Sequence, residues 1–527
     1  MIFRMLRYIA LALITLLLPV TYLWVRGQEM TYLNWAIPVA GFLSLSLFVL
    51  WYLIFGTAPW RRRLTRCGMV ALVVVGVAAV GRLLLRYEGS SSGSSFPRLV
   101  WAWSSTDQDS ATPPFTETAS ANKIPTEWIE DSPDFLGPER DGMWPEGSFG
   151  TDWTEQAPEL LWRRSLGKAW SSFAVANGLA ITQEQIGDDE LTTALDLLTG
   201  ATRWQHRDPG VRLLLVKEEN AGAAMGGDGP RATPVIFGEY VYTMGSTGRV
   251  HCLELASGRE RWSRDLTAEH GGEVQEWGMA SSPLIVPSAH LVIVTGSDEP
   301  GATLVALDLA DGSERWVYRA SGASYSSPRL LNILGVEQIV SVNRVEVSAH
   351  DPASGERLWS YDWPGKFPKV GQPVLIGKDQ LLLTASYGAG SPLLQLAREG
   401  TRWTVRERWK STRLKTKFSS PVVLDGYAYG LDEGRLAAID LATGEKVWKN
   451  EKFGFGQQLL FADHLLVQTE SGAVVVGTIS PAGFTETGRL EALSSMTWNT
   501  PVVAGRLLLV RNDHEAACYL LPAPSAK

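Results

Sequence analysis

The sequence of 527 residues predicts an all-β fold, an eight-bladed β-propeller, preceded by an N-terminal transmembrane helical segment. Three observations lead to this prediction. The first 86 residues contain three long apolar stretches, the remainder repeats a short motif that ends in Trp, and the 21 Trp residues are far more than a globular chain of this length normally carries. The three Cys without CxxC spacing and the seven scattered His residues predict neither a disulfide framework nor a metal site.

Composition divides the chain into five parts. We expect a membrane anchor over residues 1–86, a flexible Ser/Thr/Pro-rich linker over 87–130, a lead-in segment over 131–158, the propeller over 159–521 and a tail over 522–527. The anchor contains nine Arg and one Glu, a net charge of +8, so the remaining residues carry −16. This negative charge argues against nucleic acid as a partner.

The anchor contains three candidate transmembrane stretches, Tyr8–Val25, Thr31–Trp60 and Cys67–Leu85. A helix needs about 20 apolar residues to cross the hydrocarbon core, so we expect about three spans. An alternative interpretation of the first stretch is a signal peptide, but no small-residue cleavage site follows it and two further apolar stretches do.

The arginines of the anchor predict its orientation. Arg4 and Arg7 precede the first stretch, and Arg61–Arg66 lies between the second and the third. The positive-inside rule places these segments in the cytoplasm. We therefore expect a multi-pass protein of the cytoplasmic (inner) membrane whose chain after Arg86 lies on the extracytoplasmic, periplasmic side.

The propeller prediction depends on a motif in which an acidic residue falls four positions before Gly and a Trp four positions after it. An alternating strand would end at the acid, whose carboxylate accepts turn amides, and Gly would take a positive φ before the chain reverses into the strand that carries Trp. With a second hairpin upstream, each unit has the four antiparallel strands of one blade. The Gly–Trp pairs are Gly200 and Trp204, Gly258 and Trp262, Gly312 and Trp316, Gly355 and Trp359, and Gly444 and Trp448.

The number of blades and their closure follow from the order of the strands. Eight inner strands start at Ser171, Ala232, Ser281, Ser326, Gly371, Ser419, Gly456 and Asn499. The eighth unit ends after its third strand, whereas Glu159–Arg163 resembles a Trp strand without a blade. We expect this segment to complete the eighth blade and to remove the exposed edges of an open sheet. Each motif Trp is expected to wedge between neighbouring blades.

These blades resemble the pyrroloquinoline-quinone (PQQ) repeat family, whose signature is Ala-x-Asp-x-x-(Thr/Ser)-Gly-x-x-x-Trp in an eight-bladed propeller. The segments FLGPERDGMWPE (Phe135–Glu146) and GDGPRATPVI (Gly227–Ile236) are similar to bacterial propeller proteins named after the propeller subunit of the outer-membrane barrel-assembly machinery. The resemblance implies one of two functions. The family contains quinoprotein dehydrogenases, with PQQ and Ca²⁺ in the central channel, and scaffolds without a cofactor.

The sequence favours a non-enzymatic, protein-binding scaffold without a cofactor, and the alternative is a membrane-bound PQQ-dependent dehydrogenase. Alcohol-type quinoproteins have adjacent cysteines, whereas Cys252 and Cys518 fall on different blades. No loop is dense in the oxygen ligands that Ca²⁺ requires. In favour of the enzyme, some membrane quinoproteins also place transmembrane helices before the propeller. The assembly-factor scaffold is a lipoprotein, but here no lipobox Cys follows the first apolar stretch.

Two groups of residues are candidate sites, and no residue is assigned a catalytic role. The first is expected to rim the channel as a cofactor- or ligand-binding site, the alternative being a water-filled channel with satisfied polar groups. The second is a basic island in blade five, where eight Lys/Arg face two Glu between Arg398 and Lys417; it is expected to bind an anionic partner, the alternative being a solvated loop. The rim candidates are Arg231, Lys417, Gln457, Trp498 and Asn499, and the partner-binding candidates are Arg406, Arg408, Lys410, Arg413 and Lys415.

Overall fold

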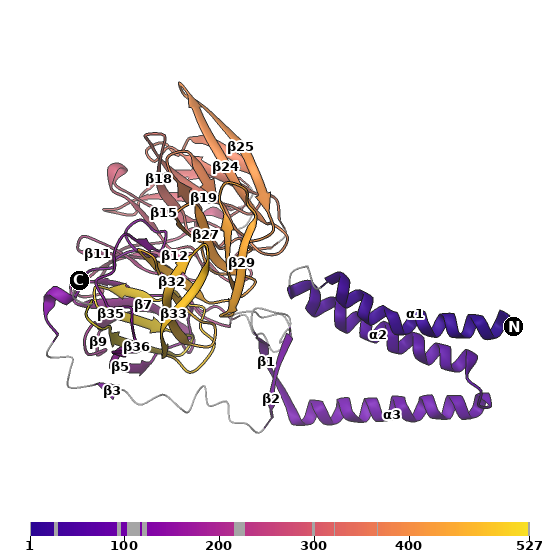
Figure 1. The fold of residues 1–527 in the computed structure, drawn as a ribbon. Coiled ribbons are helices and arrows are strands. Elements are labelled where there is room, and N and C mark those ends of the chain that lie inside the picture. Colours follow the sequence, from indigo (N-terminus) through magenta and orange to yellow (C-terminus); the bar gives the residue numbers. More distant parts are fainter. Residues whose placement is uncertain are drawn as a thin grey trace. The chain divides into compact units, whose positions relative to one another are not determined.

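The computed structural model describes residues 2–25, 30–91, 96–102, 116–117, 124–214, 227–297, 301–320, 322–365 and 367–524. The chain divides into two compact units, which are described separately. One contains the N-terminal helices and the hairpin that follows them, and the other contains the propeller (Figure 1).

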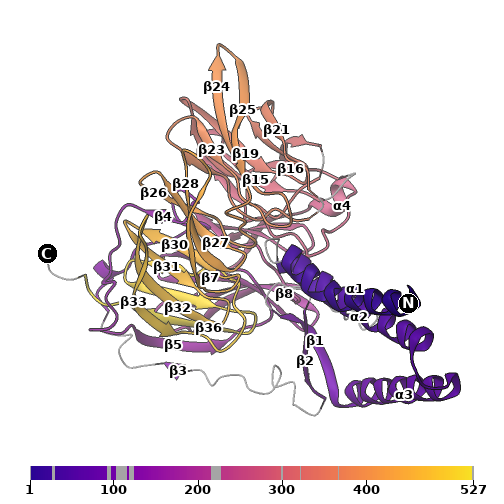
Figure 2. The same cartoon turned by 45° about the vertical axis from the view of Figure 1, so that its right-hand side comes forward.

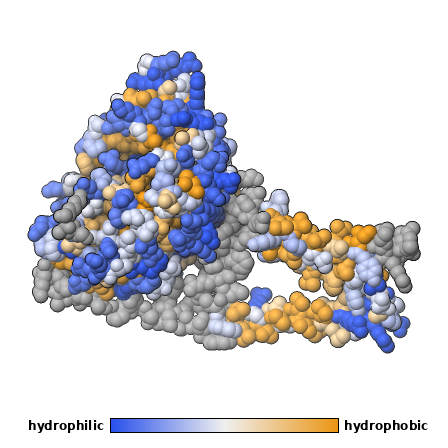
Figure 3. Space-filling view, viewed as in Figure 1, coloured by the Kyte–Doolittle hydropathy of each residue, from blue (hydrophilic) through white to orange (hydrophobic). Residues whose placement is uncertain are grey.

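The N-terminal unit begins with three helices, α1 (Ile2–Val25), α2 (Met30–Phe55) and α3 (Trp60–Leu84). All three are long and apolar enough to cross a membrane, and their described side chains are mostly apolar on the surface (Figure 3). The indole of Trp51 in α2 donates a hydrogen bond to the Arg7 carbonyl in α1 over 2.9 Å. The guanidinium of Arg63 donates to carbonyls at the end of α2, one of them Ile54 at 3.3 Å, and thereby caps that helix.

A β-hairpin follows where the sequence predicts the start of a flexible linker. Strands β1 (Leu85–Ser91) and β2 (Phe96–Trp101) pair with Arg86 opposite Val100. The prediction and the structure differ because the Ser-rich run between β1 and β2 made the whole stretch look unstructured in the sequence, whereas β2 itself consists largely of residues that favour strands. Residues 103–115 and 118–123 of the predicted linker lie outside the described residues, and β3 (Thr116–Glu117) pairs with β5 of the propeller.

The propeller consists of eight blades, each with four antiparallel strands (Figures 1 and 2). The strands follow the sequence order in the first seven blades, and the sheets of blades seven and eight each gain a fifth strand, β4 (Met143–Trp144) and β3. Blade one contains β6 (Ala174–Ala176), β7 (Leu179–Ile186), β8 (Asp189–Asp196) and β9 (Thr202–Asp208); blade two contains β10 (Val235–Phe237), β11 (Tyr240–Met244), β12 (Arg249–Glu254) and β13 (Glu260–Asp265); blade three contains β14 (Leu284–Val286), β15 (Leu291–Thr295), β16 (Leu304–Asp308) and β17 (Glu314–Tyr318); blade four contains β18 (Arg329–Ile333), β19 (Val336–Val342), β20 (Glu346–His350) and β21 (Arg357–Asp362). Blade five contains β22 (Val374–Ile376), β23 (Gln380–Leu382), β24 (Ser391–Glu399) and β25 (Arg402–Ser411); blade six contains β26 (Val422–Leu424), β27 (Tyr427–Asp432), β28 (Arg435–Asp440) and β29 (Lys446–Lys452); blade seven contains β30 (Gln457–Phe461), β31 (His464–Gln468), β32 (Ala473–Ser480) and β33 (Gly483–Glu491); blade eight contains β34 (Val502–Ala504), β35 (Leu507–Arg511), β36 (Glu515–Leu520) and β5 (Glu159–Ser165). A short helix, α4 (Leu266–His270), follows blade two.

The predicted closure of the ring is confirmed, because the first strand of the propeller completes its last blade. Strand β5 pairs with β36, and Trp162 lies opposite Cys518. The Nη1 atom of Arg163 in β5 lies 2.9 Å from Oε2 of Glu515 in β36. Both ends of the propeller sequence therefore lie in one sheet, which leaves no open edge between the first and the last blade.

The spacing of the repeated motif is explained by contacts between neighbouring blades. The indole of Trp262 donates to the Leu309 carbonyl of the next blade over 3.1 Å and lies flat beneath Gly312. Gly312 has φ +71°, and a Cβ at this position would lie 2.6 Å from Cδ2 of Trp262. The motif therefore requires glycine both for its backbone conformation and for the indole of the preceding blade. The same arrangement joins Trp162 to Gly200, Trp204 to Gly258, Trp316 to Gly355 and Trp409 to Gly444.

Three blade interfaces depart from this arrangement. Between blades six and seven, the Trp448 indole donates to the Ser480 carbonyl over 3.0 Å, but nothing lies within 4 Å of a Cβ built on the turn glycine, Gly483. Trp359 of blade four donates to Oε1 of Gln338 within its own blade, because blade five lacks the motif glycine. In blade seven Gly488 occupies the position opposite Val476 at which the other blades carry Trp. Trp153 of the lead-in segment packs against Gly488 and is only 5% exposed. The lead-in segment thus supplies the indole that blade seven lacks.

Candidate binding site at the channel and the blade-five hairpin

One end of the channel is covered by the lead-in segment. Ser132 pairs with Val175 in the inner strand of blade one, and β4 (Met143–Trp144) runs parallel to β30 of blade seven (Figure 2). Between these points, the buried guanidinium of Arg140 donates to the carbonyls of Ser282 and Pro283 at 3.1 and 2.8 Å. These contacts fix the segment across the inner strands of several blades. This role was not predictable from the sequence, because the segment has neither strand periodicity nor the blade motif.

The hydroxyl-rich starts of the inner strands form hydrogen bonds from blade to blade around the channel. The backbone N–H of Thr233 donates to Oγ of Ser282 over 2.9 Å, and the N–H of Ser282 donates to Oγ of Ser327 over 2.9 Å. Ser281 continues the pattern with a 2.8 Å bond from its hydroxyl to the Ser326 carbonyl. The Ser-Ser-Pro pattern therefore satisfies buried backbone groups at the centre of the ring.

The opposite end of the channel, here called the mouth, is lined by aromatic rings, most of which lie just before the inner strands. Trp498 lies with its ring centroid 4.9 Å from that of Trp170 and 4.7 Å from that of Phe418. Nζ of Lys417 lies 4.6 Å from the ring centroid of Tyr387 and 4.5 Å from that of Phe455. The mouth therefore combines stacking surfaces with a buried cation held in cation–π contacts.

The five rim candidates occupy different environments. Lys417 and Trp498 belong to the mouth. Gln457 and Asn499 are buried, and their side-chain amides donate hydrogen bonds to backbone carbonyls. Arg231 donates to the carbonyls of Gly227 and Gly229, both at 2.8 Å, and burial lowers the pKa of its guanidinium to about 10. Only two of the five candidates, Lys417 and Trp498, thus lie together in the mouth.

The mouth also contains a carboxylate, that of Glu470. Oε1 of Glu470 accepts the Trp498 indole N–H over 2.9 Å, and Oε2 accepts the backbone N–H of Phe455 over 3.2 Å. Burial raises the pKa of Glu470, and the nearby charge of Lys417 opposes that shift. Glu470 follows a second strand in the sequence, so strand counting alone did not place it beside residues that precede inner strands.

The mouth residues do not fit PQQ with Ca²⁺. A protein Ca²⁺ site needs six to eight converging oxygens. Both carboxylate oxygens of Glu470 already accept hydrogen bonds, and Lys417 places a cation beside them. Within the part of the chain that the structure describes, the Asn499 amide oxygen is the one side-chain oxygen of the rim candidates that is buried without a partner. Cys252 and Cys518 are separate free thiols.

The basic island forms a long hairpin of β24 and β25, which extends beyond the other blades (Figure 1). Its tip is hydrophilic in the space-filling view (Figure 3). Five cations on β25 and the turn after it are exposed, and none forms an ion pair with a described residue: Arg402, Arg406, Arg408, Lys410 and Arg413.

Two basic residues of the island are not part of this exposed surface. Nζ of Lys415 lies 3.6 Å from Oδ1 of Asp432, and Lys417 is buried in the mouth. The prediction that Lys415 presents a charge to a partner is therefore wrong, because the next blade supplies a carboxylate that the linear sequence does not place beside it.

The closed ring of eight blades and the Trp–Gly contacts between them define the chain as a PQQ-repeat β-propeller. A family model described as "Outer membrane protein assembly factor BamB" matches residues 188–450. Proteins of that name from Escherichia coli (strain K12) and Salmonella typhimurium are each 24% identical, over 49% and 46% of this chain. The matches cover 66% and 62% of those proteins, less than two thirds of their length. Within its class, the chain is thus similar to BamB.

A solved structure of a differently named protein has the same fold. The crystal structure of quinohemoprotein alcohol dehydrogenase from Comamonas testosteroni has a TM-score of 0.55 and 11% sequence identity, covering 77% of this chain and 84% of that one. At this identity the likeness concerns the fold alone.

Proposed function

We propose that this protein is a membrane-anchored scaffold whose propeller lies on the extracytoplasmic side of the cytoplasmic membrane and binds an acidic protein partner through the β24–β25 hairpin. The observation that carries the proposal is the row of five exposed, unneutralised cations from Arg402 to Arg413. Like charges on one strand repel one another, and a partner with negative charge relieves that repulsion and accelerates association. The similarity to proteins named as assembly factors supports a role in binding other proteins.

The anchor supports the membrane part of the proposal. Three helices meet the length and composition of membrane spans, and Arg61–Arg66 lies at the start of α3. A PQQ-dependent dehydrogenase is the less favoured function, because the mouth residues do not provide the oxygen ligands that Ca²⁺ requires.

The experiment uses a photo-crosslinking residue in place of Thr404, an exposed residue of β25, in the full-length protein in its own membranes. We expect a protein adduct that weakens as salt rises, because exposed charges are screened over about 8 Å at physiological ionic strength. The test variant changes four cations of the hairpin to Gln: Arg402, Arg406, Arg408 and Arg413.

A matched control changes four exposed arginines on the outer strands of other blades to Gln, each of which forms an ion pair within its blade: Arg203, Arg259, Arg315 and Arg357. Both variants remove four positive charges, and exposed ion pairs stabilise a fold by at most about 1 kcal/mol each. We expect the hairpin variant to lose the adduct and the control variant to keep it. Equal adducts in both variants would refute the proposed surface.

A further inference from the structure

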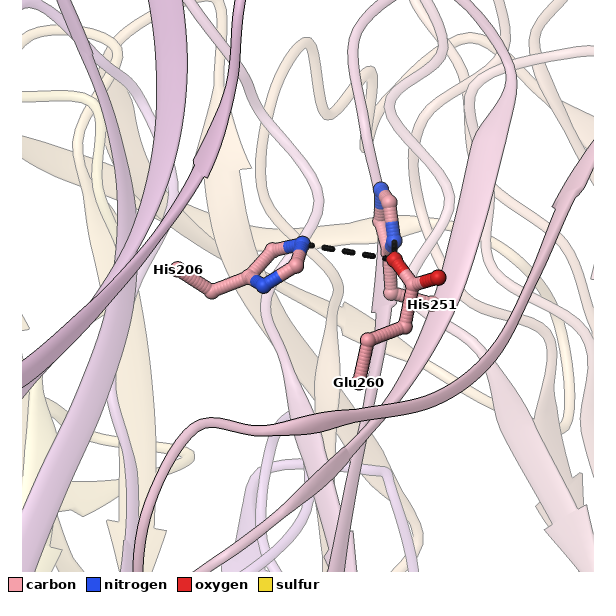
Figure 4. A group of neighbouring side chains, drawn as sticks. All are labelled: His206, His251 and Glu260. Carbon is pink, nitrogen blue, oxygen red and sulfur yellow. Dashed lines mark hydrogen bonds and ion pairs between the residues drawn. The ribbon is translucent and has the colours of Figure 1, made fainter.

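Three side chains on the third and fourth strands of two neighbouring blades converge at one point (Figure 4). His206 lies on β9 of blade one, His251 on β12 of blade two and Glu260 on β13 of blade two. Their possible ligand atoms all lie within 4.8 Å of one another. The interface between blades one and two brings them together, although 45 positions separate the two histidines in the sequence.

The distances suit a small tetrahedral cation. Nε2 of His206 lies 3.5 Å from Oε2 of Glu260, and Nδ1 of His251 lies 3.0 Å from the same oxygen. A zinc ion bound at about 2.0–2.1 Å separates its ligand atoms by about 3.3 Å, so small side-chain movements would complete the geometry. We propose that His206, His251 and Glu260 bind a late first-row divalent cation of the Zn²⁺ class, with solvent in the fourth position.

The surroundings of the cluster hold two of these side chains in position. Nε2 of His251 lies 2.7 Å from Oδ2 of Asp208, which leaves Nδ1 directed at Glu260. A carboxylate on the outer nitrogen is the usual partner of a histidine that binds metal, because it fixes the tautomer and makes the ring more basic. The hydroxyl of Ser263 donates to Oε1 of Glu260 over 2.9 Å and leaves Oε2 for the cation.

The donor set indicates the class of metal. Two imidazoles and one carboxylate suit Zn²⁺ and its neighbours, whereas Ca²⁺ and Mg²⁺ prefer sites built entirely from oxygen. The side chain of Glu260 is 39% exposed, so an ion can enter from solvent, while that of His251 is only 6% exposed. A histidine binds a metal through a deprotonated ring nitrogen, so any proton on Nδ1 of His251 passes to the buffer when the cation binds.

The alternative is an ion-pair network in which the protonated His251 joins two carboxylates and no metal binds. Calorimetric titration with Zn²⁺ distinguishes the metal site from the ion-pair network. The sample is the full-length protein in detergent, without a histidine tag and treated with a chelator. We expect one ion per chain and a melting temperature that rises with Zn²⁺ concentration. With Co²⁺ as the probe, a visible absorption band should report nitrogen and oxygen ligands.

Variants identify the ligands. His206→Ala and Glu260→Gln should each weaken Zn²⁺ binding by at least tenfold, and Glu260→Gln changes only a partly exposed side chain, so its fold is expected to persist. Asp208→Asn should weaken binding about 10–100-fold by releasing the ring of His251. The matched control is His270→Ala, because Nε2 of His270 lies 3.2 Å from Oε2 of Glu314 across the next blade interface.

The control is expected to bind Zn²⁺ like the unaltered protein. Binding by His206→Ala and Glu260→Gln with unchanged affinity would place the metal elsewhere and overturn the proposal. The absence of binding to the unaltered protein at micromolar Zn²⁺ would leave only the ion-pair network and overturn it as well.

Discussion

The contact between the indole of one blade and the glycine of the next is the interaction on which the ring depends, and Gly312→Ala tests it directly. Two costs follow from the structure. The φ of +71° places an alanine in the left-handed region, which costs about 1–2 kcal/mol. The new Cβ would also lie 2.6 Å from Cδ2 of Trp262, and moving a packed side chain costs about 1–3 kcal/mol more.

A second glycine separates these two costs. Gly238 has φ +59°, and nothing lies within 4 Å of a Cβ built on it. Gly238→Ala therefore pays only the backbone cost of about 1–2 kcal/mol. We expect Gly312→Ala to lower the free energy of unfolding by about 1–3 kcal/mol more than Gly238→Ala. Urea unfolding of the full-length proteins, followed by far-UV circular dichroism, measures the difference.

Trp262→Ala completes the test as a double-mutant cycle. Alone, it should cost about 3–5 kcal/mol through the cavity that it leaves. In the Trp262→Ala variant, the loss of unfolding free energy caused by Gly312→Ala should fall to that caused by Gly238→Ala, because the indole that obstructs the new methyl group is gone. Equal penalties at the two glycines, or strict additivity in the double variant, would refute the inference that the indole fixes the motif glycine.

Two further predictions concern closure and topology. Deletion of Glu159–Arg164 removes most of β5, and with it Trp162 and the Arg163–Glu515 ion pair; we expect aggregation on size-exclusion chromatography, and unchanged elution and melting would contradict the closure argument. A reporter that is active only outside the cytoplasm should function when fused after Arg86 and fail when fused at Arg63, and the reverse pattern would invert the proposed orientation.

The sequence predicted the fold well because the repeated motif contains both a contact within one blade and a contact between neighbouring blades. The acid at the turn accepts nearby amides, as Asp440 does from the backbone of Thr443 over 2.9 Å, and this part of the motif is visible within one unit. The glycine and the tryptophan that touch belong to neighbouring blades, yet five units carry both residues at the same spacing, so the contact is visible as a repeat in the sequence. Closure was predictable for the same reason, since a strand with Trp stood at one end and a strand was missing at the other.

The candidate sites were less predictable because they depend on contacts that the repeat does not encode. Lys415 looked like its basic neighbours until blade six placed Asp432 beside it. Glu470 is placed in the mouth by the hydrogen bond that its carboxylate accepts from the indole N–H of Trp498. His206 and His251 meet because β9 packs beside β12, a contact between blades that no spacing rule for metal ligands describes. The strand positions were predictable, whereas the side chains across a blade interface were not.

Two of the three interfaces that lack the Trp–Gly contact indicate where the propeller differs from a simple ring. At blade seven, Gly488 gives up the wedge position and Trp153 fills it, so the segment that covers one end of the channel is bound by the same packing that joins the blades. At blade five, the loss of the motif glycine frees the turn between β24 and β25, because no indole of blade four requires it there. A hairpin without that constraint can lengthen and carry like charges without weakening the ring. The exposed cations lie on this hairpin, which favours blade five over the regular blades as the partner-binding surface.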